Sequence, residues 1–252
     1  MSSQEDKIHQ VMSSGAQALS LTYEAIRQFD SPRVFMRTSM NINSLELGIL
    51  TPQQYRYVAQ RTSQADHLFE RHLHKLLEKI PEFMANPNPI QFFTVPAYGR
   101  MLKNGTLSTI LFDRLTAHPQ VSSSMLCIEL SADLLFEELE PLQAELQKLR
   151  ELGVRIALTE VGDEFCPLLR LSQLPYDLAF LDTYPVSLVN TPGDSAFEGL
   201  AGFLHSCGKK MIAVDVKDRD LLFHLEQLGC DGYSLMDSAS LFPDYSQEDS
   251  AQ

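Results

Sequence analysis

The chain has 252 residues, of which 44% are hydrophobic, enough to bury the core of one α/β domain. It carries 33 acidic against 20 basic residues, a formal charge of −13, which disfavours nonspecific nucleic-acid binding and association with acidic membrane surfaces. No apolar run approaches the roughly 18 residues of a membrane span, and the four cysteines form no CxxC pair. We therefore predict a soluble, cytoplasmic protein with reduced thiols and no cofactor.

The two ends of the chain are polar and poor in apolar residues. This composition predicts a flexible tail over residues 1–15, an acidic tail over 242–252 and a single domain over 16–241. The first two apolar stretches, Leu19–Ile26 and Val34–Ser39, are separated only by RQFDSPR. Because that connection is too short for a crossover helix, the two stretches are expected to pair as antiparallel strands.

The second half of the sequence alternates amphipathic helices with short apolar strands. Three helices are expected to end at Gly153, Gly208 and Gly229, and each is followed by an apolar run. The remaining predicted strands are Ile90–Val95, Met125–Leu130, Arg155–Leu158, Leu178–Leu181, Met211–Val214 and Gly232–Leu235. Eight strands in this rhythm predict an α/β fold, a modified TIM-like (β/α)8 barrel with an irregular, partly antiparallel start.

Two stretches carry a resemblance to a known family. LRELGVRIAL at 149–158 and LPYDLAFLD at 174–182 resemble the EAL-domain wording L-x-x-L-G-V-x-I-A-L-D-D-F-G and L-P-x-D-x-L-K-I-D. The similarity extends from about Tyr23 to Leu235. It implies the EAL-type barrel, whose members with intact sites hydrolyse cyclic di-GMP with two divalent metals.

The positions that carry the family's chemistry are not matched. The resemblance places the family's namesake Glu-Ala-Leu at Arg37-Thr38-Ser39 and a family Asn at Thr94. Of the two Glu residues in the family's Glu-Ile-Thr-Glu strand, Glu129 matches the first, whereas Ala132 stands at the second. The paired aspartates fall at Thr159-Glu160 and a Lys falls at Phe180. It also places Ala-Glu-Gly-Val-Glu at 213–217 and the late Gln-Gly near Ser234. Two metal ions about 3.5–4 Å apart require several convergent carboxylates. We therefore predict no catalytic and no metal-binding residues.

The candidate ligand-binding residues at the barrel mouth are Arg37, Thr94, Thr159, Glu160 and Asp182. One arrangement has Glu160 hold a single cation together with Asp182 and Asp163. In the other, which we favour, Glu160 forms an ion pair with Arg37 across the mouth.

Elsewhere, His67, Glu70 and His74 share one face of a predicted helix, where a metal site would need three converging ligands. Arg71 lies among them, so a solvated helix face is favoured. His205 and His224 are expected at helix surfaces. Cys166 precedes Pro167 and is expected at a packed helix start.

Three functions remain open. The favoured one is a non-catalytic, EAL-like regulatory protein that acts in bacterial signalling through an unidentified protein partner. The alternatives are a receptor that binds cyclic di-GMP or another nucleotide without hydrolysis, with Arg37 on a phosphate, and a residual cyclic di-GMP phosphodiesterase. Homodimerisation is expected only by analogy with the family.

Overall fold

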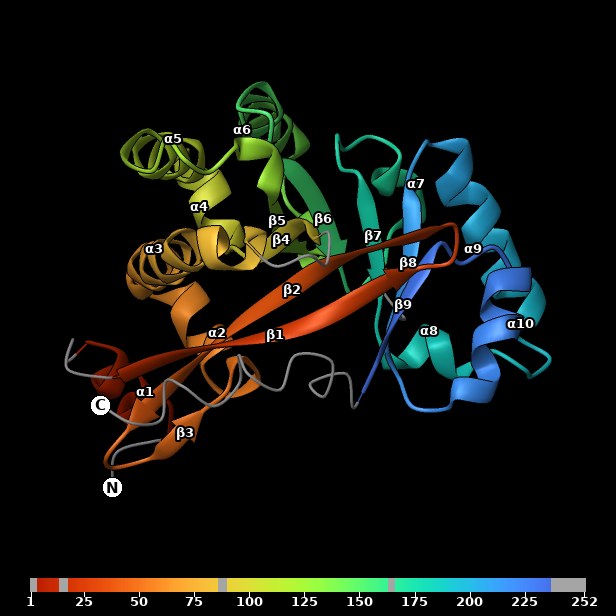
Figure 1. Ribbon diagram of the computed structural model, residues 1–252, viewed down its shortest axis with the longest axis horizontal. Helices are drawn as coiled ribbons and strands as arrows, with labels where there is room; N and C mark the ends of the chain where they lie inside the picture. Colours follow the sequence, from red (N-terminus) through yellow and green to blue (C-terminus); the bar gives the residue numbers. More distant parts are fainter. Residues whose placement is uncertain (1–3, 14–17, 86–89, 163–165, 237–252) are drawn as a thin grey trace.

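The computed structural model describes residues 4–13, 18–85, 90–162 and 166–236 (Figure 1). Its strands are β1 (Ala18–Gln28), β2 (Ser31–Ser44), β3 (Gly48–Leu50), β4 (Ile90–Pro96), β5 (Leu126–Ser131), β6 (Arg155–Thr159), β7 (Leu178–Leu181), β8 (Lys210–Val216) and β9 (Gly232–Leu235). Its α-helices are α1 (Gln4–Ser13), α2 (Pro52–Arg61), α3 (Gln64–Met84), α4 (Gly99–Asn104), α5 (Leu107–Ala117), α6 (Leu139–Glu151), α7 (Leu168–Leu171), α8 (Thr183–Ser187), α9 (Asp194–Ser206) and α10 (Leu222–Gln227). Short 3-10 turns occupy Ser123–Met125, Ala132–Phe136 and Arg219–Leu221.

The sheet closes into a barrel, as predicted. Its strand order is β1-β9-β8-β7-β6-β5-β4-β2-β3, and a further pairing of β1 with β2 closes the ring of eight, leaving β3 outside it. Strands β4 to β9 run parallel to β2, whereas β1 is antiparallel to both of its neighbours. The irregular start of the barrel is therefore confirmed.

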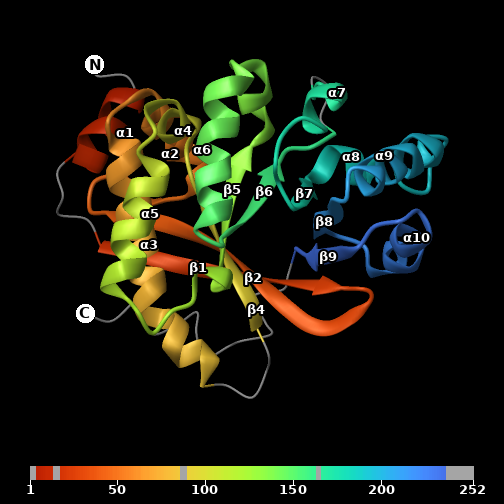
Figure 2. The same cartoon turned by 90° about the horizontal axis from the view of Figure 1, so that it is seen from above.

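The opening hairpin is longer than the sequence suggested. Strands β1 and β2 are joined by only Phe29 and Asp30, and their register shifts between Arg27 and Gln28. The turn extends beyond the neighbouring strands (Figure 2). Because β1 is reversed, this turn lies at the end of the barrel where the parallel strands begin.

Two apolar clusters hold the barrel together. Helices α3 to α6 cover one half of the ring, and α9 and α10 cover the other (Figure 1). The larger cluster lies between helices and sheet, and the smaller one fills the barrel interior. The interior cluster consists of Ile26, Phe35, Phe92, Cys127, Ala157, Leu178, Phe180, Ile212 and Val214. Successive strand residues point to opposite faces, so the next inward positions along these strands form the adjoining layer.

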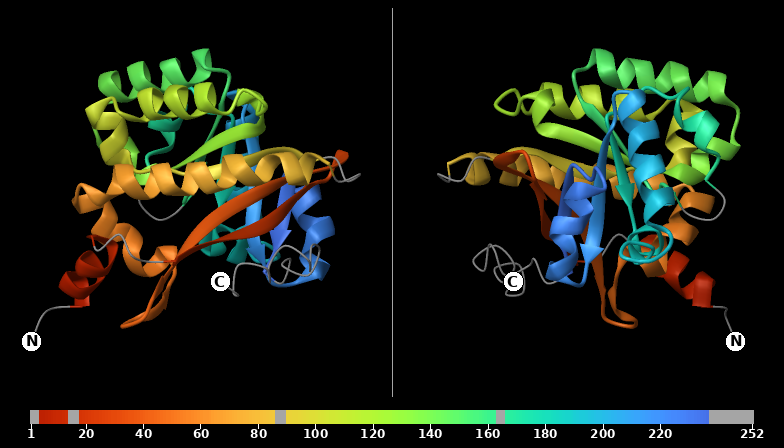
Figure 3. Two further views of the ribbon diagram at one scale, coloured as in Figure 1. Left: turned by 60° about the vertical axis from the view of Figure 1, so that its left-hand side comes forward. Right: turned by 90° about the vertical axis from the view of Figure 1, so that its right-hand side faces the viewer.

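The prediction of a flexible tail over residues 1–15 is wrong for residues 4–13, which form helix α1 (Figure 3). The helix packs on α2, and Ile8, Val11 and Met12 are buried. These three residues lie at helical spacing and supply the apolar stripe that the polar composition concealed. The acidic tail predicted over 242–252 lies outside the described residues.

None of the helices in the described part of the chain combines the length and the apolar character that a bilayer crossing requires.

Candidate functional site

A polar layer lies next to the apolar interior, toward the carboxyl ends of the parallel strands. Arg37 of β2, Thr94 of β4 and Glu129 of β5 each follow an interior apolar residue by two positions. Glu24 of β1 is the partner of Arg37 in the antiparallel register. We call these four residues the Arg37 cluster.

Arg37 is the centre of this cluster. Its Nε donates to Glu129 Oε1 and Oε2 at 3.1 and 3.2 Å, and its Nη1 lies 3.9 Å from Glu24 Oε2. The Thr94 hydroxyl also donates to Glu129 Oε1, and the guanidinium lies 5.3 Å from the Phe180 ring centroid. Only 5% of the Glu129 side chain is exposed, so the cation and the anion stabilise each other where water is largely excluded.

The pKa values of the cluster follow from burial and charge. Burial lowers the pKa of Arg37, but Glu129 and Glu24 more than reverse this effect, and the pKa is held above its ordinary value. Burial raises the pKa of Glu24, although Arg37 and a hydrogen bond from Ser234 oppose the increase. Among the described residues, Glu24 Oε1 is buried without a hydrogen-bond partner. Arg37 therefore remains a cation, and the pKa of Glu24 lies above its ordinary value.

A buried histidine contacts the cluster through Thr38. His72 of α3 lies 2.8 Å from the Thr38 hydroxyl, which in turn donates to the Thr94 carbonyl. Burial lowers the pKa of His72 to about 3, so the ring is neutral at neutral pH. The Thr38 backbone N–H donates to Thr94 Oγ1 at 3.3 Å. These contacts fix the Thr94 hydroxyl against Glu129.

The predicted ion pair between Arg37 and Glu160 is wrong. Glu160 lies beyond the end of β6, where Ser131 donates to its carboxylate and Arg56 of α2 approaches at 3.5 Å. Arg37 lies one layer deeper in the barrel, where it forms its ion pair with Glu129. The Thr159 hydroxyl donates to the Leu130 carbonyl at 3.5 Å, toward the neighbouring strand.

Asp182 occupies the N-cap position of α8, and its charge contributes to the raised pKa of Arg37. Asp163, the third carboxylate of the single-cation arrangement, lies outside the described residues. Within the ranges that the structure describes, no group of three side chains is placed to hold a metal ion. Of the five candidates, Arg37 and Thr94 therefore meet around Glu129, Asp182 acts on Arg37 through its charge, and Thr159 and Glu160 lie apart.

The other candidates have the structural roles that were favoured. His67 and His74 are exposed on α3, and Glu70 pairs with Arg114 at 2.8 Å. His205 and His224 each contact an aspartate at 2.8 Å, Asp231 and Asp194 respectively. Cys166 packs against the outer apolar cluster.

The backbone is unusual at two strand ends near the mouth. Glu160 and Asp215 have φ values of 62° and 55°, a left-handed conformation that is uncommon for residues other than glycine. Such backbone outliers cluster at functional sites.

Residues 9–234 match the family model of the EAL domain. The chain belongs to the EAL domain family. A cyclic di-GMP phosphodiesterase of Pseudomonas aeruginosa is 21% identical over 187 residues, which are 73% of this chain and 32% of that protein. This chain therefore spans about a third of the length of that relative.

Two solved structures show the same fold. The PaMucR phosphodiesterase in complex with c-di-GMP has a TM-score of 0.80 at 18% identity, with 92% of this chain and 94% of that chain covered. The FimX EAL domain from Pseudomonas aeruginosa bound to c-di-GMP has a TM-score of 0.77 at 17% identity, with 93% and 94% covered. The EAL-type barrel predicted from the sequence is thereby confirmed.

The donor set of this EAL domain does not fit the two divalent metals expected of an intact family site. The carboxylate of Glu129 is already bonded to Arg37 and Thr94, and a guanidinium cation lies in the same interior space. Additional divalent cations there would be repelled, because repulsion between charges rises steeply where water is excluded.

Proposed function

We propose that this EAL domain does not hydrolyse cyclic di-GMP and acts in the bacterial cytoplasm as a regulator that binds a protein partner. The observation that carries the proposal is the Arg37–Glu129 ion pair inside the barrel mouth. In this ion pair the Arg37 guanidinium provides the positive charge that metal ions provide in a metal-dependent site. The Glu129 carboxylate is therefore not available to activate a water molecule. The scaffold is retained while its hydrolytic chemistry is lost.

The first test is an assay for hydrolysis. Purified protein is incubated with cyclic di-GMP and either Mg²⁺ or Mn²⁺, and linear product is quantified. We expect no product above a protein-free blank, and the same result for the Glu160→Ala variant. Turnover that disappears in Glu160→Ala or Glu129→Gln would show that this chain is a residual phosphodiesterase.

The second test concerns the partner. Tagged protein is purified from its native host at the natural expression level, beside a tag-only control and an unrelated acidic protein. We expect one protein to be recovered in a fixed ratio to the bait and to bind again as a purified component. Recovery of nothing beyond the two controls would contradict a protein-binding role. Light scattering of the same preparation measures whether the bait itself is a homodimer.

The second candidate function is a cyclic di-GMP receptor without hydrolysis. It is favoured by the two solved relatives in complex with c-di-GMP and by the permanent charge of Arg37, whose side chain is 21% exposed. A guanidinium can donate two parallel hydrogen bonds to a phosphate, the geometry that such a receptor would use.

Calorimetric titration with cyclic di-GMP, with and without Mg²⁺, separates the two functions. Saturable heat that is lost in Arg37→Met and retained in Arg56→Met would support the receptor. Absence of both heat and a thermal shift would remove it and leave the protein-binding role.

A further inference from the structure

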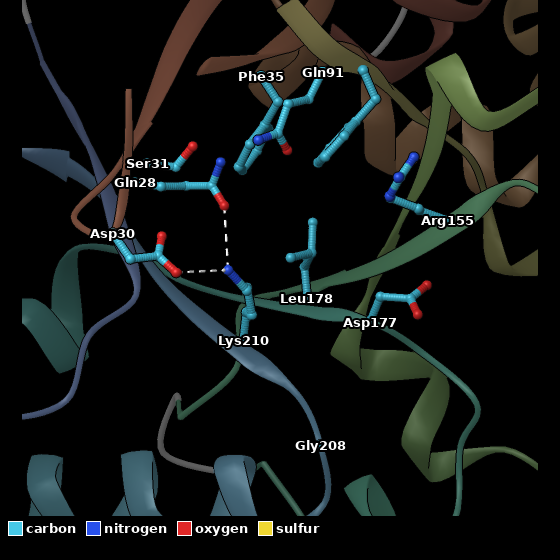
Figure 4. A pocket seen from close by; sticks show the side chains of 11 residues that line it. Gln28, Asp30, Ser31, Phe35, Gln91, Arg155, Asp177, Leu178, Gly208 and Lys210 are labelled. Atoms are coloured by element: carbon cyan, nitrogen blue, oxygen red, sulfur yellow. Dashed lines mark hydrogen bonds and ion pairs between the residues drawn. The ribbon is translucent and has the colours of Figure 1, made fainter. Parts of the chain in front are cut away.

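A cavity lies at the end of the barrel opposite the Arg37 cluster. It has a volume of about 480 Å³ and is lined by Gln28, Asp30, Ser31, Phe35, Gln91, Phe92, Arg155, Asp177, Leu178, Gly208 and Lys210 (Figure 4). Its strand residues come from the first positions of the parallel strands: Phe35 precedes Arg37 by two residues, and Arg155 begins β6. TIM-type barrels normally keep their functional groups at the other end, so the fold alone does not account for this cavity.

The reversed first strand builds one wall of the cavity. Because β1 is antiparallel, its last residue, Gln28, and the turn residue Asp30 reach the end where the parallel strands start. Lys210, the first residue of β8, extends toward them, with Nζ 3.3 Å from Gln28 Oε1 and 3.5 Å from Asp30 Oδ2. Figure 4 shows Arg155 on the opposite side of the cavity.

Two acidic and two basic side chains line the cavity, Asp30, Asp177, Arg155 and Lys210, and Arg155 is the cation among them whose charge is least engaged. Within the described ranges, Arg155 has no carboxylate within ion-pair distance; it donates to the Ser124 carbonyl and lies over the Phe92 ring at 4.8 Å. Asp177 is occupied by the Ile156 N–H at 2.9 Å. The pair of Lys210 with Asp30 is weak, because the two side chains are 43% and 69% exposed and exposed pairs contribute at most about 1 kcal/mol.

The floor of the cavity is apolar. Phe35 and Phe92 stack with their centroids 4.5 Å apart and 16° between their planes, and Leu178 lies beside them (Figure 4). Stacking holds the guanidinium of Arg155 in one plane, the orientation needed for two parallel hydrogen bonds to a carboxylate. Gln28 and Gln91 add amide groups at the rim.

We propose that this cavity is a second ligand site, which binds a small organic carboxylate with an apolar or aromatic body. The carboxylate binds Arg155 and Lys210, and the apolar body packs beside Leu178. The volume lies within the range of about 300–1,000 Å³ that is usual for small-molecule sites. The site is separate from the barrel mouth, and the proposal does not depend on the function of the mouth.

The test is a titration of the full chain with 4-hydroxybenzoate, followed by amide chemical shifts. We expect saturable shifts at Gln28, Gln91, Arg155 and Lys210, with millimolar or tighter affinity. Arg155→Met removes the charge and keeps an apolar stem, and we expect it to weaken binding about tenfold or more, as for the loss of a charge-assisted hydrogen bond. The matched control is Arg219→Met, at an exposed cation outside the cavity, which should bind as the wild type does.

Two further measurements keep the proposal falsifiable. Thermal unfolding confirms that Arg155→Met is folded, and Gln91→Ala, which keeps every charge, should weaken binding by a smaller factor. Titration with inorganic phosphate tests the class of ligand. The absence of saturable shifts with 4-hydroxybenzoate, shifts confined to the barrel mouth, or phosphate binding as tight as that of the carboxylate would each overturn the proposal.

Discussion

Arg37 is the cation at the centre of the polar layer inside the barrel. Its guanidinium lies between Glu129 and Glu24, and 21% of its side chain is exposed. Replacing it with methionine leaves two carboxylates facing each other without a cation. Because unpaired buried charge is costly, we expect Arg37→Met to lower the free energy of unfolding by about 3 kcal/mol in urea titrations.

Arg56→Met is the matched control, because it removes an arginine whose ion pair with Glu160 is 31% and 40% exposed. Exposed pairs contribute little, so the loss should stay below about 1 kcal/mol. Equal losses in the two variants would contradict a central role for Arg37 in the polar layer.

His72 predicts a pH dependence of stability. Its pKa falls from 6.5 to about 3 because burial disfavours the charged ring. Between these values the unfolded chain binds a proton that the folded chain does not, so stability present above pH 6.5 is lost as the pH falls. The loss from this residue is about 1.4 kcal/mol for each pH unit within that window.

The difference between the wild type and His72→Gln isolates this contribution, because the variant cannot titrate there. Urea unfolding from pH 7 to pH 4 should give a shallower pH dependence for His72→Gln. The exposed His67 lies on the same helix, and His67→Gln should follow the wild-type curve. Parallel curves for His72→Gln and the wild type would show that the ring titrates normally in the folded protein.

Helix α1 has the polar composition of a flexible tail, but its apolar residues are buried. Met12 is 1% exposed, whereas Met84, the last residue of α3, is 52% exposed. Truncation of a buried methionine removes packing and leaves a cavity, so we expect Met12→Ala to cost about 2 kcal/mol or more. Met84→Ala should stay within about 0.5 kcal/mol. Denaturant unfolding of both variants tests whether α1 is part of the folded domain.

At the scale of the whole molecule, closure of the barrel depends on the contact between β1 and β9. A Cβ on Gly232 would lie 2.5 Å from the Arg27 carbonyl oxygen, which is on the partner strand. Gly232→Ala must therefore push the two strands apart, and we expect a loss of about 2 kcal/mol or more in thermal or urea unfolding.

Gly202, in the middle of α9, provides the control, because a Cβ there meets nothing within 4 Å. Alanine at this position should stabilise the protein by about 0.5–1 kcal/mol through its higher helix propensity. A Gly232→Ala variant as stable as Gly202→Ala would show that the β1–β9 contact does not hold the ring closed.

The class of fold could be predicted without the structure. Helix-ending glycines followed by apolar runs predicted the parallel strands, and a short connection predicted the antiparallel start, because these features depend only on neighbouring residues. The apolar stripe of Ile8, Val11 and Met12 is also a local signal for an amphipathic helix. The polar residues around it led instead to the prediction of a tail.

Which charges meet could not be predicted from the sequence, because it depends on how the strands are registered in three dimensions. Glu24 lies opposite Arg37 because of a hairpin register that shifts at Arg27 and Gln28, an irregularity without a clear sequence signal. Glu129 reaches the same guanidinium although the two residues are 92 positions apart in sequence. Glu160, whose own backbone is left-handed, contacts Ser131 and Arg56 instead. An ion pair forms only where two charged groups lie within a few ångströms of each other. In a closed barrel that distance depends on the register of the strands and on the layer in which each side chain lies. Residues far apart in the chain determine both together.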